Sequence, residues 1–486
     1  MTNSSSALVS RLWRLCSLLR KDGVTYPQYV TELSYLIFLK LASELAGDTL
    51  DIPSGYDWQS LLAQPDELLL DRYRATLSLL GKSKKSRAMQ AVFSGAHTVV
   101  RESSTLRRLI EAIDESGWHS DERDTFGDAY EGLLQKNAEE TKRGAGQYFT
   151  PRSLVNAIVE ILDPKPSEII QDPAAGTGGF LIAANRAIKD KYSSLSSSKQ
   201  RFQSKLALRG VENVHDTYRL LCMNLYLHNI EADHIFMGDT LSHLGEDGSL
   251  KNADIILSNP PFGPSGSTPT RTDLPITNKS TNFQLPFVEH CMNALAPGGR
   301  AAVIVPDNIL FEGGRGRELR RELMRNFELH TILRLPTRIF YAQGVRTNVL
   351  FFSRPLTQPN IDATKDVWFY DLRSQSDSAL NSAAFENGLR EFVTAYGTDP
   401  NGGSARIDGT DNGKFRCFSR EYIAERDDDL YIAWLSDDEN SENELELAAP
   451  DIVAEVVERH LISALSEIRA LMSELCEDGL TTDEEP

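Results

Sequence analysis

The sequence has 486 residues, more than one hydrophobic core usually supports, so two or three folded units are expected. Its hydrophobic fraction of 41% and charged fraction of 25% are those of a globular protein, and no apolar run is long enough to span a membrane. The five cysteines are scattered without the spacing of metal ligands, and the first residues lack a signal-peptide pattern. We therefore expect a cytoplasmic protein with no metal site and no membrane association.

The net charge of −19 is concentrated near the C-terminus. Residues 437–486 contain sixteen Asp and Glu and two Arg, so they carry −14 and leave −5 for the preceding 436 residues. Binding to phosphates needs a local basic surface rather than a basic total, so this balance does not exclude nucleic acid as a partner. It does indicate that the chain does not hold DNA alone.

Residues 1–140 are expected to form an all-α helical domain. Leucines recur at helical spacing near the N-terminus, and the stretch from Tyr29 to Leu45 is densely apolar.

Residues 141–435 alternate between strand and helix patterns. Strands are expected at 167–171, 207–212, 234–237, 253–258, 301–305, 329–335, 348–353 and 366–371. Such alternation predicts an α/β fold with a mostly parallel, doubly wound sheet that is covered by helices on both faces. Ligands bind at the carboxyl ends of the strands in such sheets, and two distinctive motifs fall there.

Residues 436–486 are expected to be an acidic linker followed by a helical tail. An apolar stripe runs from Ile452 to Met472 at helical spacing. It can pack either on its own domain or on a partner protein.

The first motif is a glycine-rich turn between a strand and a helix. It reads Asp-Pro-Ala-Ala-Gly-Thr-Gly-Gly-Phe from Asp172 to Phe180. Gly176 and Gly178 allow a ligand to approach the backbone closely. The dinucleotide-binding fingerprint would place Gly where this chain has Leu181, so a different ligand is expected.

The second motif reads Asp-Ile-Ile-Leu-Ser-Asn-Pro-Pro-Phe from Asp254 to Phe262. Its apolar run predicts a buried strand that the two prolines end, so Asn259 projects from the strand end. The Asn259 side-chain oxygen and the Pro260 carbonyl can both accept hydrogen bonds from one exocyclic amino group. The Phe262 ring can stack on the planar group that carries it. Taken alone, the residues also fit a strand followed by a plain proline-rich turn.

Together the two motifs resemble those of the methyltransferases that use S-adenosylmethionine to methylate adenine in DNA. The upstream segment Gly146-Gln-Tyr-Phe-Thr-Pro-Arg152 extends the resemblance to the modification subunits of Type I restriction–modification systems. The resemblance covers roughly residues 5–435. It implies a Rossmann-like methyltransferase domain over residues 141–435, a target base flipped out of the duplex, and a role in defence against phage.

The resemblance also implies the roles of particular residues. The catalytic set is Asn259, Pro260, Pro261 and Phe262. The set that binds S-adenosylmethionine is Tyr148, Phe149, Thr150, Asp172, Ala174, Gly176, Thr177, Gly178, Glu212 and Asp239. Within it, Asp172 would contact the methionine part, Glu212 the ribose hydroxyls and Asp239 the adenine amine of the cofactor.

Partners follow from the same resemblance. They are DNA, a specificity subunit that takes two modification subunits and receives the C-terminal helix, and a restriction subunit. Two alternatives stay open. A free-standing adenine DNA methyltransferase would need its own recognition domain, and none of suitable size follows residue 380. A protein-glutamine methyltransferase would also use Asn-Pro-Pro with an aromatic residue, but without the helical front.

Overall fold

The structure, a computed structural model, describes residues 9–15, 19, 23–44, 52–82, 87–115, 123–140, 150–192, 194–231, 233–337, 339–340, 346–373, 383–409 and 413–434. The chain divides into two compact units. The first comprises Met1–Thr240 and Asp247–Asn259, and the second comprises Leu241–Glu246 and Pro260–Pro486. The expected C-terminal helix lies outside the described residues.

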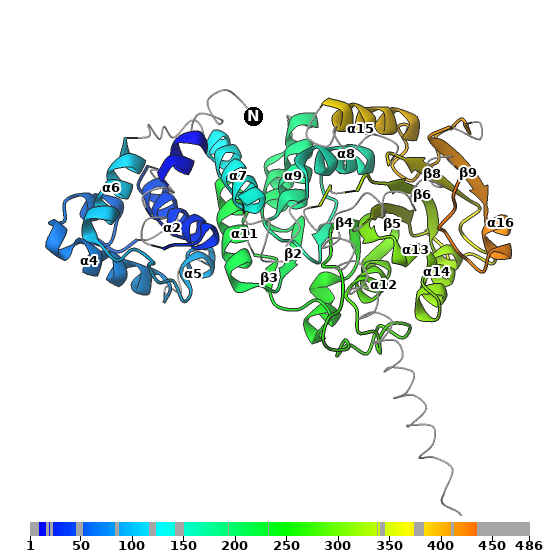
Figure 1. Ribbon diagram of the computed structural model, residues 1–486, viewed down its shortest axis with the longest axis horizontal. Coiled ribbons are helices and arrows are strands. Elements are labelled where there is room, and N and C mark those ends of the chain that lie inside the picture. Colours follow the sequence, from blue (N-terminus) through cyan, green and yellow to red (C-terminus); the bar gives the residue numbers. More distant parts are fainter. Residues whose placement is uncertain are drawn as a thin grey trace, which may run out of the picture. The chain divides into compact units, whose positions relative to one another are not determined.

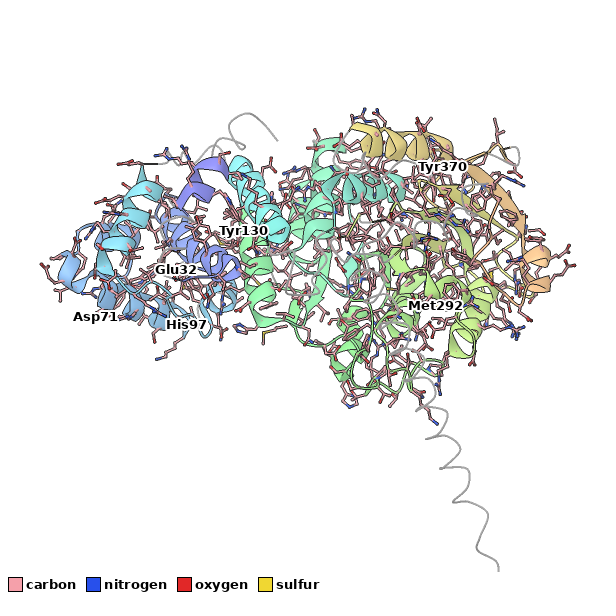
Figure 2. The ribbon with its side chains drawn as sticks, viewed as in Figure 1. Glu32, Asp71, His97, Tyr130, Met292 and Tyr370 are labelled. Atoms are coloured by element: carbon pink, nitrogen blue, oxygen red, sulfur yellow. The ribbon has the colours of Figure 1, made fainter. Side chains whose placement is uncertain are left out.

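The first unit begins with helices, as the apolar spacing predicts (Figure 1). They are α2 (Tyr26–Glu44), α3 (Trp58–Leu62), α4 (Asp66–Leu80), α5 (Arg87–Phe93), α6 (Ser103–Asp114) and α7 (Arg123–Glu140). Their core includes the buried carboxylate of Glu32, which accepts hydrogen bonds from the Tyr73 hydroxyl at 2.7 Å and the Val99 N–H at 2.9 Å. Tyr130 of α7, labelled with Glu32 in Figure 2, pairs with the Ser34 hydroxyl at 2.6 Å.

Four parallel strands complete the first unit. They are β1 (Ile170–Asp172), β2 (Leu208–Glu212), β3 (Ile235–Met237) and β4 (Ala253–Ser258), in the order β3-β2-β1-β4. The helices between them are α8 (Arg152–Leu162), α9 (Gly179–Lys191), α10 (Ser197–Lys205) and α11 (His215–Leu227), and the 3₁₀ helix η3 (Gly248–Leu250) precedes β4. This order places the carboxyl ends of β1 and β4 side by side. The first motif begins at the end of β1, and the second runs along β4 and continues beyond its end.

One arginine joins the N-terminal helices to the parallel strands within the first unit. The buried Arg219 of α11 donates to the carbonyls of Val92 and Ser94, both at 2.8 Å, where α5 ends. A cation suits the carboxyl end of a helix because the last carbonyls there lack partners within the helix.

The second unit is a mixed sheet in the order β5-β7-β6-β8-β9. Its strands are β5 (Leu295–Pro306), β6 (Glu328–Arg334), β7 (Thr347–Ser353), β8 (Asp366–Asp371) and β9 (Phe415–Ser419). Its helices are η2 (His243–Glu246), α12 (Gln284–Ala294), α13 (Asn308–Phe311), α14 (Arg315–Asn326), α15 (Ala383–Tyr396) and α16 (Arg420–Glu425). Figure 1 shows α15 on one side of these strands and α12 and α14 on the other.

All eight predicted strands are present, and the predicted α/β class is confirmed. The pairing is parallel throughout the first unit and between β6 and β8. It is antiparallel where β7 lies between β5 and β6, and between β8 and β9. Strand β9 was not predicted. Across the described residues, every helix is too short or too polar to cross a bilayer.

Candidate active site

The glycine-rich turn lies between β1 and α9 in the first unit. Gly176 and Gly178 have φ values of +55° and +86°, a left-handed conformation that favours glycine. A Cβ added at Gly176 or Gly179 would meet nothing within 4 Å, so the backbone borders open space there. The turn therefore offers the close approach to a ligand that the sequence predicts.

Gly178 has a different neighbour. A Cβ at this position would lie 2.6 Å from Cδ1 of Leu221 on α11. The space beside Gly178 is thus filled by packing between α9 and α11, and the tight turn rather than a ligand requires this glycine.

Asp172 ends β1 and is buried. One of its carboxylate oxygens accepts hydrogen bonds from the Ala174 N–H at 3.1 Å and the Ser258 hydroxyl at 2.9 Å. Burial raises the pKa of the Asp172 carboxyl to about 7, although both hydrogen bonds oppose the shift and the nearby Glu212 adds to it. Asp172 therefore titrates near neutral pH, and a cationic group placed beside it would favour its charged form.

Glu212 ends β2 and holds the glycine turn. Its two oxygens accept from the Gly176 N–H at 3.0 Å and the Val214 N–H at 2.8 Å, and burial raises the pKa of Glu212. Each oxygen keeps a lone pair for a further donor such as a ribose hydroxyl. Asp239, exposed after β3, follows Gly238, whose N–H donates to the Glu212 carbonyl at 3.0 Å.

Asn259 follows β4 and is the last residue of the first unit. Its side-chain NH2 donates to the Thr150 hydroxyl oxygen at 3.0 Å. Its side-chain oxygen, Oδ1, is buried and has no hydrogen-bond partner among the described residues. Buried acceptors are normally satisfied, so this oxygen is poised to receive a donor from a ligand.

The second unit begins at Pro260, which is buried. Phe262 is half-buried and lies edge to face with Phe340, with ring centroids 6.3 Å apart. Gly263 then accepts from the Phe283 N–H at 3.1 Å, which fixes the chain just after the motif.

The loop after Phe262 differs from expectation. The sequence suggests that Arg271 is either a phosphate contact or a solvated loop residue, but its side chain is buried. Its guanidinium donates to both carboxylate oxygens of Asp273, at 2.8 and 3.0 Å, and contacts His290 Nδ1 at 2.6 Å. Arg271 therefore secures the loop, because Asp273 and His290 both engage its guanidinium.

Several supporting residues escaped the sequence analysis. Asn224 of α11 donates to the Thr177 carbonyl at 2.8 Å, and the Thr240 hydroxyl donates to the Pro173 carbonyl at 2.6 Å. Together with Ser258 they fix both ends of the glycine turn. The signal for Asn224 in the sequence was its polar side chain within a run of α11 that is otherwise largely apolar. Of the predicted cofactor residues, Tyr148 and Phe149 lie outside the described residues.

The residues present fit a nucleoside sulfonium ligand. Open space borders the glycine turn, and acceptors lie at the ends of β1 and β2. A buried acceptor that lacks a partner among the described residues ends the first unit after β4. Parallel strands with a glycine turn after β1 are typical of Rossmann-like domains, and the class of S-adenosylmethionine-dependent methyltransferases shares this arrangement. A class I methyltransferase of this kind from Listeria monocytogenes shares the fold, with a TM-score of 0.53 over 80% of this chain and all of that one, at 15% identity.

Comparison with known proteins narrows the class. The family model for N-6 DNA methylases matches residues 121–446. The methylase subunit of the Type I restriction enzyme StySPI from Salmonella potsdam is 44% identical over 97% of this chain and 96% of its own, and so is the EcoKI methylase subunit of Escherichia coli K12. The crystal structure of the EcoKI M protein matches with a TM-score of 0.55 at 37% identity, covering 99% of this chain and 100% of that one.

A structure of a Type I restriction–modification system, solved to explain complex assembly and conformational transition, also matches. Its TM-score is 0.76 at 26% identity, and the match covers 98% of this chain and 99% of the other. The chain belongs to the N-6 DNA methylase family, among the methylase subunits of Type I restriction enzymes. It is an adenine-specific DNA methyltransferase, and the resemblance in its sequence is confirmed.

Proposed function

We propose that Asn259 activates the adenine amine and that the chain does so as the modification subunit of a Type I restriction–modification complex. The observation that carries the first part is the Asn259 side-chain oxygen, which is buried and lacks a partner among the described residues. Methylation of the adenine amine needs such an acceptor, because an oxygen that accepts from the target NH2 can hold and orient it.

The adenine amine is a poor nucleophile because its lone pair is delocalised into the ring. The Asn259 oxygen and the carbonyl of the next residue, Pro260, would each accept one N–H, and this would favour a tetrahedral nitrogen with its lone pair aimed at the methyl group. Orientation and electrostatic stabilisation suffice for this step, and no covalent intermediate with the protein is required. Pro261 would stiffen the turn that presents both acceptors.

The target nitrogen is hidden in a duplex, so the base must be flipped out. The half-buried Phe262 ring would stack on the flipped adenine, a contact worth roughly 1–3 kcal/mol in comparable base–aromatic stacks. This ring already lies edge to face with the ring of Phe340.

The cofactor residues are those that surround the glycine turn. When bound, S-adenosylmethionine supplies the methyl group from its sulfonium sulfur. Asp172 would attract the cationic methionine part, and Glu212 would accept from the ribose hydroxyls with its remaining lone pairs. Asp239 would accept from the cofactor's adenine amine. Ala174 and Thr177 would shape the turn. By the family resemblance, Thr150, Tyr148 and Phe149 would lie near the methionine carboxylate.

Assembly forms the second part of the proposal. Relatives at 44% identity are methylase subunits of Type I restriction enzymes, which supports assembly into a multisubunit complex. By the family resemblance, that complex would contain two modification subunits for one specificity subunit, together with a restriction subunit. DNA target choice would then belong to the specificity subunit. Of the described cysteines, Cys222, Cys291 and Cys417 are not in disulfides, which supports a cytoplasmic location.

The decisive test of the catalytic role is Asn259→Ala. This variant should lose methyl transfer to DNA adenine by at least about 100-fold, because the removed oxygen is a transition-state acceptor. Binding of S-adenosylmethionine, measured by calorimetry, should persist. The assay uses the chain copurified with the products of neighbouring genes, and mass spectrometry identifies N6-methyladenine.

Asn387→Ala is the matched control, since Asn387 lies exposed on α15 and its side-chain oxygen accepts from Arg390 of the same helix at 3.3 Å. Normal methylation by Asn259→Ala would refute the assigned role. Loss of cofactor binding together with activity would place Asn259 in the cofactor site instead.

A further inference from the structure

The amide of Asn259 can act only in one of two orientations. The terminal torsion of an Asn side chain is broad and roughly two-fold, so rotation by half a turn exchanges its oxygen for its NH2. With the oxygen forward, Asn259 accepts from the adenine amine. With the NH2 forward, two donors would face each other and the amine could not be held.

Thr150 selects the productive orientation. Its hydroxyl oxygen receives the Asn259 Nδ2–H bond at 3.0 Å, across 109 residues of sequence. That bond occupies the NH2 and leaves Oδ1 as the buried acceptor without a partner among the described residues. One hydroxyl thus determines which end of the amide meets the substrate.

Thr150 is held by the start of α8. Pro151 is the N-cap of this helix, and its carbonyl accepts from the Val155 N–H at 3.0 Å. The next residue, Arg152, forms a two-pronged ion pair with the buried Glu131 of α7, with Nη1 to Oε1 at 2.6 Å and Nη2 to Oε2 as the second bond. Bidentate pairs of this kind fix direction as well as distance.

The surroundings keep that ion pair rigid. One turn before Glu131, Asp128 pairs with Arg186 of α9. The buried His228 packs against Gly127 so closely that a Cβ there would lie 2.5 Å from the ring, and burial with nearby Arg186 lowers the pKa of His228 to about 3. His228 is therefore neutral and does not compete with Arg152 for Glu131. Burial raises the pKa of Glu131, and the charge of Arg152 opposes this shift.

We propose that Thr150 is a positioning residue that orients the Asn259 amide for catalysis, and that the Glu131–Arg152 ion pair of α7 and α8 holds Thr150 in place. This inference rests on the proposed role of Asn259. It gives Thr150 a task different from the cofactor contact that the family resemblance implies. It also connects the N-terminal helices to catalysis through α7.

The test compares Thr150→Val with Thr150→Ser in the full-length chain, copurified with its partners. Valine keeps the shape of threonine but removes the acceptor, whereas serine retains it. Thr150→Val should lower kcat by about 10- to 100-fold, because the amide then samples both orientations, with KM and the calorimetric Kd for S-adenosylmethionine unchanged within about twofold. Thr150→Ser should retain near wild-type kcat. Thr150→Ala serves the same purpose if the valine variant does not fold.

Glu131→Gln tests the anchor. Like Thr150→Val, this variant should lower kcat, but by a smaller factor, and its affinity for S-adenosylmethionine should be retained. Asp163→Asn is its matched control, because it breaks the Asp163–Lys191 ion pair at the opposite end of α8 and should leave kcat unchanged.

Three results would overturn the inference. Wild-type kcat in Thr150→Val would show that the amide orients without the hydroxyl. A weakened Kd for S-adenosylmethionine with unchanged kcat would make Thr150 a cofactor contact. Equal loss in Thr150→Ser and Thr150→Val would indicate a packing role. None of these depends on Asn259→Ala, so failure of the inference and failure of the catalytic assignment are separable.

Discussion

At the scale of single residues, the charge state of Asp172 controls the cofactor site. Its carboxyl is buried between the ends of β1 and β4, and its pKa is raised to about 7. Because this folded-state pKa lies above the usual value of 3.8, folding is favoured at low pH and loses stability as the pH rises through about 7. A cation bound beside Asp172 would stabilise the charged carboxylate and so offset this loss of folding stability.

We therefore predict that S-adenosylmethionine binds more tightly as the pH rises from about 6 to about 7.5. Below its pKa the Asp172 carboxyl is neutral and offers little attraction to the cationic methionine end, and above it the carboxylate is charged. Calorimetry in buffers of different ionisation enthalpy should reveal proton release on binding near pH 6.5. Asp172→Asn should bind more weakly and lose the pH dependence. A dependence that survives in this variant would assign the titration to another group.

Site residues could be predicted from the sequence where the signal lies within one short motif. Asn259 and Asp172 were identified from neighbouring residues because the strand end, the prolines and the glycines are local signals. The bond from Thr150 to Asn259 spans 109 residues and could not be read from spacing. Arg271 was misjudged because a loop composition rich in Gly, Ser and Pro does not reveal that one side chain is buried against Asp273 and His290.

At the scale of elements, the strands were predictable because each is an uninterrupted apolar run. Strands β4 and β8 have the predicted bounds, and the ends of the other six lie within six residues of prediction. The run Phe415–Ser419 contains Arg416 and Cys417 and was too polar to stand out, although its pairing with β8 satisfies its backbone. The antiparallel direction of β7 was also hidden, because a buried strand has the same apolar pattern in either direction.

Packing of α9 on α11 leads to a prediction about the two glycines of the turn. Gly178→Ala should destabilise the protein by about 2–4 kcal/mol, because the new Cβ would press on Leu221 and the residue would adopt a left-handed conformation. Gly176→Ala meets open space and should cost only about 1–2 kcal/mol. It should instead weaken S-adenosylmethionine binding, because the methyl group projects where the cofactor is proposed to lie.

Denaturant unfolding and calorimetry on both variants separate these effects, each serving as the control for the other. Equal stability losses would mean that the crowding at Leu221 is relieved by a small shift of α11. Unchanged cofactor affinity in a folded Gly176→Ala would remove the close backbone approach from the proposed site.

At the scale of the whole molecule, the net charge is negative although the substrate, DNA, is also negatively charged. The body of the chain carries −5 and the last fifty residues carry −14. DNA affinity depends on neutralising phosphates with basic side chains, so a chain of this balance should bind DNA weakly without help. We therefore expect the chain to gain its DNA target from a partner, and we expect the apolar stripe from Ile452 to Met472 to dock on it.

Deletion of residues 446–486 tests that docking. The truncated chain should retain S-adenosylmethionine binding, because the glycine turn, Asp172, Glu212 and Asn259 all belong to the first unit. It should fail to form a complex with the specificity subunit on size-exclusion chromatography, since the apolar stripe would be gone. A full-length variant with Leu461 and Leu465 changed to Ser provides a control that keeps the acidic charge, and it should fail in the same way. An unchanged complex would show that the stripe packs on its own domain. Sequence-specific methylation by the isolated full-length chain would instead favour the free-standing enzyme, because no partner would then be needed to choose the DNA target.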